Sequence, residues 1–494
     1  MRKTGQSPNL GLLQPEEGCP LDEIIVKMPA RHKGLQRAMQ ALVDRVVLFE
    51  TEAPKQRSVD YRAHERGLAA DTAEIERQGH AISLTALDVD ADRIRINGVE
   101  HVRVLRAEPA DYKTRVGPVA IPRSLFRPVG ERNAPTVNTV TLRSGAIEDE
   151  WLPETASAMA YRLARGPSRE AEQASRVEGT LPYSHASFEK IGHAVGRMMV
   201  DRRVEIEEVL IAELPIPKEA ASVSVALDRT SMPMEEPRPK PPGRPRKDAP
   251  KNPIEVVYRM AWTGTVTLHD AEGKALETIR YGRMPYEDGE LLAETLASDA
   301  LALVQRFRRL EVVTLGDGAG DVQTLLEKHV DEPSFGRRVF RLIDLWHVLE
   351  KLGEALALME RDEATRKARL AEWRRQLCAR RSASQTILAE LVASGKEYSG
   401  GKDCPVHAAI TYLENQADLM GYVEARNLGL PIGSGAVEAT GKSLFALRVK
   451  RPGARWKAPT GAEVITMRAH MLSDRWERAS QLALTQPRAE IHAA

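Results

Sequence analysis

The expected fold depends on two short stretches, Val223-Ser224-Val225-Ala226-Leu227-Asp228 and Val312-Val313-Thr314-Leu315-Gly316-Asp317. In the first, apolar side chains alternate with small or polar ones, which is the pattern of a β-strand. The second is a nearly continuous apolar run, which is typical of a buried strand. Each run ends on an aspartate. We therefore predict two strands that each bring a carboxylate to the edge where open α/β sheets place functional groups.

The surrounding sequence extends these two runs into a sheet. Strand-like segments cover 256–262, 265–268, 276–281 and 339–345, and helical patterns cover 290–308 and 322–329. From 348 to about 422 the chain is helical in period and highly charged. This order predicts an α/β sheet that is interrupted by an all-helical insertion. We place the whole domain at 213–478, followed by a C-terminal tail at 479–494.

The first 212 residues have a different pattern, which predicts an N-terminal α+β region. Residues 1–81 have helical spacing, and 82–150 show short alternating runs separated by turn residues such as Asn97-Gly98. Residues 151–212 return to helical spacing in three segments. These segments are compatible with a DNA-binding helix-turn-helix, but an ordinary helical bundle gives the same pattern.

Composition excludes several classes of protein. The chain has 494 residues, enough for two to four domains, and no apolar run long enough to cross a bilayer. It has only three cysteines, far apart, which argues against a disulfide framework or a thiolate zinc site and fits the cytoplasm. The formal net charge is +1, from 71 basic and 70 acidic residues. This balance argues against a nucleic-acid partner only if the charge is evenly spread.

Three carboxylates are the candidate site residues: Asp228, Asp317 and Glu438. Glu438 follows Gly433-Ser434-Gly435, which indicates a tight turn that opens a helix. If the two strands are neighbours, the two aspartates repel each other unless a cation lies between them, and hard oxygen ligands favour Mg²⁺ or Mn²⁺. The alternative is simpler, since a single aspartate at a strand end is more often a turn or cap residue.

Four ordered blocks resemble bacterial insertion-sequence transposases of the ISKra type. They cover roughly residues 221–478 and are Leu227–Glu236, Leu315–Ala319, Asp344–Lys351 and Pro431–Glu438, the last continuing to Trp456. The resemblance implies an RNase H-like mixed sheet and a catalytic and metal-binding triad of Asp228, Asp317 and Glu438. Two Mg²⁺ (or Mn²⁺) ions held by this triad are then implied to support cutting of the element ends and transfer of the 3′-hydroxyl to target DNA.

This resemblance makes double-stranded DNA the expected partner, and we expect a homo-oligomer that acts on the nucleoid. Two alternatives remain open: a metal-dependent nuclease or resolvase of the same fold without strand transfer, and a domesticated DNA-binding protein that has lost catalysis. Asp344 is expected to be a cap residue or a support of the metal ligands rather than a fourth ligand. For His347, a structural role near the site and a direct role in DNA contact or metal tuning are both open.

Cations concentrate in the half of the chain that carries the three carboxylates, so the argument from net charge against nucleic acid reverses. Six lie between 438 and 457, and the Pro-rich loop at 238–251 holds six more, a composition that suggests an arm in a minor groove. A solvated basic helix end and a plain basic linker are the alternatives. The predicted DNA-binding residues are Arg244, Arg246, Lys442, Arg448, Lys450, Arg451, Arg455 and Trp456.

Overall fold

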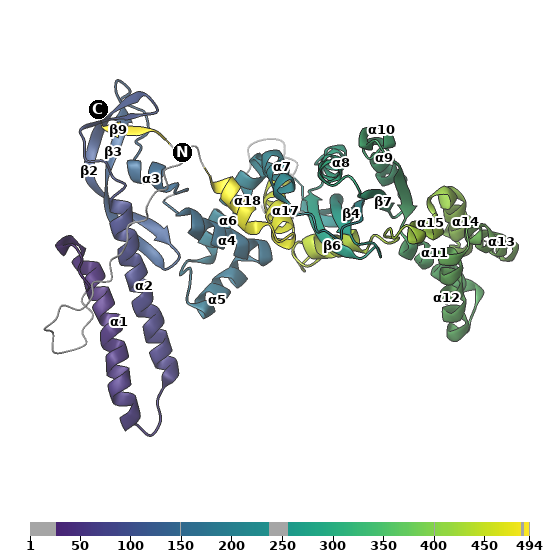
Figure 1. Cartoon of the computed structure of the whole chain (residues 1–494), viewed down its shortest axis with the longest axis horizontal. Coiled ribbons are helices and arrows are strands. Elements are labelled where there is room, and N and C mark those ends of the chain that lie inside the picture. The colour runs from purple at the N-terminus through teal and green to yellow at the C-terminus, as the bar shows by residue number, and fades with distance from the viewer. Residues whose placement is uncertain (1–25, 149, 237–254, 400, 486–488, 494) are drawn as a thin grey trace, which may run out of the picture. The chain divides into compact units, whose positions relative to one another are not determined.

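The computed structural model describes residues 26–148, 150–236, 255–399, 401–485 and 489–493, and the fold is mixed α/β (Figure 1). The chain divides into two units, residues 1–86 and 87–494. Among the described helices, none is long and apolar enough to cross a membrane. The division of the chain into five domains stays a prediction, although α18 (Trp476–Leu484) runs across its expected boundary at 478/479.

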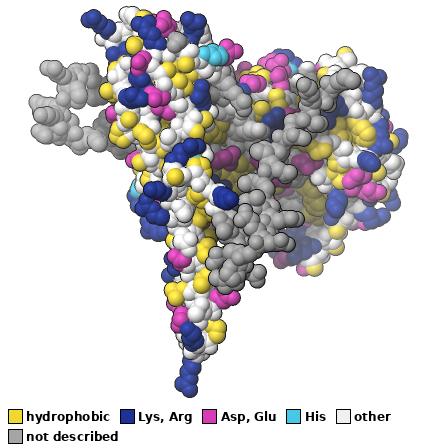
Figure 2. Space-filling model, turned by 60° about the vertical axis from the view of Figure 1, so that its left-hand side comes forward, with side chains coloured by type: hydrophobic (Ala, Val, Ile, Leu, Met, Phe, Trp, Pro, Cys, Tyr) yellow, Lys and Arg dark blue, Asp and Glu magenta, His cyan; other side chains and the backbone are white. Residues whose placement is uncertain are grey.

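The first unit is a helical hairpin made of α1 (Lys33–Glu52) and α2 (Tyr61–Thr85). The Asp60 carboxylate caps α2 by accepting a hydrogen bond from the Ala63 backbone N–H, at 3.0 Å. Within the described part of this unit only Ala38 and Leu84 are buried. Hydrophobic side chains are visible along its surface (Figure 2), and four on α1 are at least 45% exposed: Val43, Val46, Val47 and Leu48.

The second unit begins with an antiparallel sheet of order β3-β2-β1-β9. Asn97 and Gly98 both have positive φ, 49° and 82°, which is the requirement of the tight hairpin turn between β1 and β2. The region expected to be a tail supplies the edge strand, since Ala493 pairs with Ile94. The elements here are β1 (Arg93–Ile96), β2 (Val99–Thr114), β3 (Gly117–Pro128), α3 (Thr139–Ser144) and β9 (Ile491–Ala493).

Next in the chain is a helical bundle whose central helix is α6 (His185–Asp201). It has seven buried residues and packs against helices from both ends of the unit. Its exposed residues Ala186, Glu189, Lys190 and Arg197 fall at helical spacing, and the helix-turn-helix expected at 151–212 stays a prediction. The other members are α4 (Pro153–Arg165), α5 (Ser168–Glu178), α7 (Arg203–Glu213), α17 (Ala458–Leu472) and α18.

The second sheet has five strands in the order β6-β5-β4-β7-β8. Pairing is antiparallel from β6 through β4 and parallel from β4 through β8. The strands are β4 (Ser222–Glu235), β5 (Val256–His269), β6 (Ala275–Arg283), β7 (Glu311–Gly316) and β8 (Val339–Ile343). The two segments expected at 256–262 and 265–268 are thus one strand.

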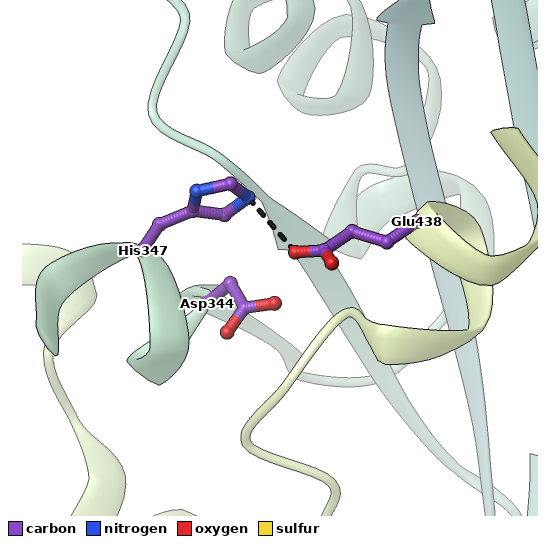
Figure 3. Close-up of side chains that lie close together, drawn as sticks. All are labelled: Asp344, His347 and Glu438. Atoms are coloured by element: carbon purple, nitrogen blue, oxygen red, sulfur yellow. Dashed lines mark ion pairs between the residues drawn. The ribbon is translucent and has the colours of Figure 1, made fainter. Parts of the chain in front are cut away.

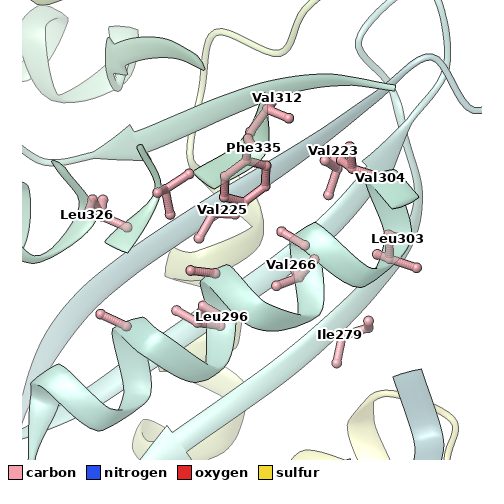
Figure 4. Close-up of a cluster of buried hydrophobic side chains, with 14 of the residues drawn as sticks. Val223, Val225, Val266, Ile279, Leu296, Leu303, Val304, Val312, Leu326 and Phe335 are labelled. Carbon is pink, nitrogen blue, oxygen red and sulfur yellow. The ribbon is translucent and has the colours of Figure 1, made fainter. Parts of the chain in front are cut away.

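The main core lies between this sheet and α8 (Gly289–Arg306), which crosses its face (Figure 4). Leu296 and Leu303 on α8 are fully buried against strand residues such as Val223, Val266 and Ile279. Two further helices, α9 (Gly320–His329) and α10 (Glu332–Phe335), connect β7 to β8 and add Leu326 and Phe335 to the same core.

One expectation about β4 is wrong: the strand does not end at Asp228. It continues for seven more residues, and Met232 and Met234 on this extension are buried. The continuation is paired with β5 and, through one bridge at Met234, with Trp456. Its parallel pairing with β7 stops at Ala226 opposite Leu315. Asp228 therefore lies where β4 extends beyond the edge of its shorter parallel neighbour.

A group of helices follows β8. They have a core of their own, formed around residues such as Leu352, Trp373 and Ile387. These helices are α11 (Leu345–Met359), α12 (Glu363–Ala379), α13 (Ala383–Gly395), α14 (Pro405–Gln416) and α15 (Tyr422–Asn427), and α16 (Gly435–Gly441) comes next in the chain.

We expect Leu296→Ala to lower the free energy of unfolding by about 2–5 kcal/mol, because it removes a fully buried side chain and leaves a cavity against the sheet. Leu291→Ala on the same helix is the matched control. Its side chain is 52% exposed, so the expected change is within about 0.5 kcal/mol. Denaturant unfolding of both variants measures the difference, and equal losses would contradict the assignment of this core.

Candidate active site

Asp228 and Asp317 come from neighbouring parallel strands. Ala226 of β4 pairs with Leu315 of β7, so two residues further on the aspartates are level with each other. The Asp317 carboxylate accepts a hydrogen bond from the Ala319 backbone N–H at 2.9 Å, which fixes the turn after β7. Gly318 in this turn has φ +90°, and a Cβ there would lie 2.7 Å from Ile343 Cδ1, so the turn requires glycine.

The Asp228 carboxyl group is held in an environment that disfavours its charge. Burial raises its pKa, and the negative charges of Asp317 and Glu438 raise it further. A hydrogen bond from the Arg229 backbone N–H, at 2.6 Å, and the charge of His347 act in the opposite direction. Asp228 thus interacts with both other members of the predicted triad and with His347.

Glu438 projects from the short helix α16 toward His347 on α11 (Figure 3). His347 Nε2 lies 3.4 Å from Glu438 Oε1, and one donor atom each from Asp344, His347 and Glu438 fit within 4.8 Å of one another. The structure therefore groups Glu438 with Asp344 and His347, two residues outside the predicted triad. The assignment of metal ligands to Asp228, Asp317 and Glu438 stays a prediction.

Asp344 is fully buried, and it joins the start of α11 to the loop before α16. One carboxylate oxygen accepts a hydrogen bond from the Trp346 backbone N–H at 2.6 Å, which caps α11. The other oxygen accepts from the Ser434 backbone N–H at 2.6 Å and from the Ser434 hydroxyl. Because three hydrogen bonds occupy this carboxylate, its main effect is to position Glu438, four residues beyond Ser434.

The donor set suits a hard divalent cation. Carboxylate oxygens are the ligands that Mg²⁺ and Mn²⁺ prefer, and His347 adds one nitrogen. Asp228 and Asp317 each have one oxygen hydrogen-bonded to a nearby backbone N–H, which leaves the second oxygen able to bind a metal. A cation between them would also relieve the repulsion that raises the pKa of Asp228.

Two contacts at the site come from α14 and were not foreseen from the sequence. The Tyr412 hydroxyl donates to the Asp317 backbone carbonyl at 2.9 Å, and the Gln416 amide donates to the Gly318 carbonyl at 3.2 Å. The helices after β8 therefore help to hold the turn that carries the second aspartate. No local motif marks Tyr412 or Gln416, since their role depends on a contact almost 100 residues away along the chain.

Two of the residues predicted to bind DNA contact the interior of the fold. Arg448 is 5% exposed, and its guanidinium donates to the Leu163 backbone carbonyl and stacks on Trp456. The Trp456 ring is partly buried and packs against the core, and its indole N–H donates to the Val449 carbonyl. The buried Arg448 guanidinium is committed to the interior of the fold, which argues against its predicted contact with phosphates. DNA binding by the partly buried Trp456 stays a prediction.

The other residues predicted to bind DNA differ in their exposure and in whether they already form ion pairs. Lys442 and Lys450 are exposed, and Lys442 lies 4.0 Å from Glu438. Arg451 pairs with Glu170, and Arg455 pairs with Glu235 at 3.3 Å. Arg244 and Arg246 lie outside the described residues.

We expect Asp344→Asn to lower the free energy of unfolding by about 1–3 kcal/mol, because the amide must turn a donor toward either Ser434 or Trp346. Hydrogen exchange at the Ser434 amide should become faster. Ser434→Ala is the matched control, since it removes only the hydroxyl bond and should cost about 1 kcal/mol with the backbone bond retained. Unchanged exchange at Ser434 in Asp344→Asn would rule out the positioning role.

Comparison with known proteins adds little to this geometry. No family model matches the chain, and neither does any curated protein. Among solved structures, the chain is similar to the Drosophila P element transposase strand transfer complex. The match covers 71% of this chain and 85% of that chain, with 13% sequence identity and a TM-score of 0.25. A similarity of this size carries no argument about fold or function.

Proposed function

We propose that the chain is a DNA transposase of the insertion-sequence type, with an RNase H-like core and an active site of Asp228, Asp317 and Glu438. The observation that carries the proposal is the pairing of β4 with β7: Asp228 and Asp317 each follow its last pair, Ala226 with Leu315, by two residues. The charges of Asp317 and Glu438 both raise the pKa of Asp228, which supports the same grouping. The order of the strands, three antiparallel followed by two parallel, supports the same reading.

In this proposal the three carboxylates hold two divalent ions. When bound there, such ions supply activation of the attacking oxygen and stabilisation of the leaving oxygen at phosphorus. The chain's own contribution is position and charge. The β4–β7 pairing and the Gly318 turn hold the aspartates, and Asp344 holds the loop before Glu438. His347 lies against Glu438 and is placed to orient its carboxylate.

Binding of DNA phosphates is proposed for the exposed cations near α16, first of all Lys442 and Lys450. Lys442 lies one helical turn from Glu438, so a phosphate that it contacts is close to the carboxylates. Arg451 and Arg455 can bind phosphates only if their ion pairs with Glu170 and Glu235 break. Self-association on DNA remains part of the proposal.

We expect Asp228→Asn to reduce joining of a labelled donor end to plasmid DNA by about 1000-fold or more, because it removes a charged ligand of the reacting centre. Binding to DNA should change little. The donor end is taken from the DNA that flanks the gene. The matched control is Glu327→Gln, which changes an exposed carboxylate on α9. The measurement is the yield of joined product on a gel with Mg²⁺ or Mn²⁺.

The same assay separates the alternatives. Cutting of the donor without any joined product would favour the nuclease or resolvase. Binding without cutting, in wild type and Asp228→Asn alike, would favour a domesticated DNA-binding protein. Full joining by Asp228→Asn would reject the active site itself.

We expect the double variant Lys442→Ala, Lys450→Ala to flatten the slope of log affinity against log salt by roughly 1.8, because each lost phosphate contact removes about 0.9. The control pair is Lys218→Ala, Lys274→Ala. Both lysines are exposed, and Lys274 lies in the β5–β6 turn, beyond His269, which is six residues along β5 from Thr263, the partner of Asp228. An unchanged slope in the first pair would show that these lysines do not contact phosphates.

A further inference from the structure

Trp346 is an exposed aromatic side chain beside the candidate active site. It lies in the first turn of α11, between Leu345 and His347, and is 53% exposed. Its indole edge lies against the loop that Asp344 holds: a Cβ built on Gly433 would be 3.1 Å from Trp346 Cδ1 and 3.7 Å from Asp344 Oδ1. The ring is therefore held at the rim of the carboxylate cluster and not in the core.

Arg374 of α12 stacks on this ring, with its guanidinium 4.6 Å from the ring centroid. Within the described part of the chain no carboxylate forms an ion pair with Arg374, so its charge is not neutralised locally. An aromatic face next to an unpaired arginine is the combination that proteins use to hold a base and its phosphate in single-stranded nucleic acid.

A cavity of about 410 Å³ is lined by Arg374 and by Leu345, the residue before Trp346. Its walls combine apolar groups with three arginine side chains, and Arg375 is already paired with Glu372. Apolar walls for a base together with cations for a phosphate match the chemistry of one nucleotide. Among the lining residues, Leu345 and Ile432 supply the apolar wall, and Arg374 and Arg426 supply the cations.

We propose that Trp346 stacks on an unpaired nucleobase of the DNA strand next to the carboxylates, with Arg374 and Arg426 receiving its phosphate. The proposal rests on the proposed function, because it assigns the ligand beside that same site. A fully paired duplex keeps its bases stacked on one another and so cannot offer a base to the ring.

The test uses the full chain in EDTA, so that no metal-dependent cutting occurs. The probe is a duplex with a three-nucleotide 3′ extension that carries 2-aminopurine, whose fluorescence falls when it stacks. Trp346→Ala should abolish the quenching and weaken binding of this probe about 5- to 150-fold, with little effect on the blunt duplex. Trp346→Phe should retain most of both effects, and Arg374→Ala should weaken probe binding several-fold.

Tyr258→Ala is the matched control. Tyr258 is 66% exposed on β5, five residues along the strand from Thr263, the partner of Asp228, or roughly 16 Å. Wild-type quenching in Trp346→Ala, or equal weakening for the probe and the blunt duplex, would overturn the inference. If thermal melting shows that Trp346→Ala does not fold, the probe binding and quenching of Trp346→Phe and Arg374→Ala test the inference instead.

Failure of the proposed function gives a different result. Absence of joining by the wild-type chain in Mg²⁺, with quenching still lost in Trp346→Ala, would reject the transposase and keep the nucleotide site. Normal joining by the wild-type chain, with quenching unaltered in Trp346→Ala, would keep the transposase and reject the nucleotide site.

Discussion

The parallel pairing of β4 with β7 is the constraint on which the candidate site depends. It sets Asp228 and Asp317 level, although 88 residues separate them in the chain. The α8 core holds this pairing from one face of the sheet, and α16 packs on β4 and β5 close to Asp228. Every other element of the site is added to this pair of strands: Glu438 through the loop held by Asp344, and the Asp317 turn through Tyr412 and Gln416.

Sequence patterns found the strands of the larger sheet well, because period-2 alternation and buried apolar runs are local properties. Asp228 and Asp317 could be chosen for the same reason. The length of β4 could not be predicted, since Met232 and Met234 count as strand residues only when β5 lies beside them. The pairing of α1 with α2 as a hairpin and the edge strand β9 were not foreseen, because each depends on a partner outside its own window of sequence.

Arg448 shows how far the residues of the site could be predicted from the sequence. Counting cations near Glu438 treated all six as equivalent, yet Arg448 is buried on a carbonyl 285 residues away along the chain, and Arg451 and Arg455 are paired with carboxylates. Net charge and charge clusters are properties of composition, whereas availability to a ligand is a property of the folded surface. Asp344 was singled out from the sequence as a supporting residue, but its link to Ser434 required coordinates.

The helical bundle has a consequence for synthesis of the chain. Phe188, Ile191 and Met199 of α6 share one core with Val464 and Met467 of α17, a helix later in the chain that is buried from Gly461 to His470. Between the end of α7 at Glu213 and the start of α17 at Ala458 the ribosome must add the whole five-stranded sheet, which takes roughly 10–50 s at usual elongation rates. During that interval the apolar face of the nascent bundle has no partner, which makes it a natural target for chaperones.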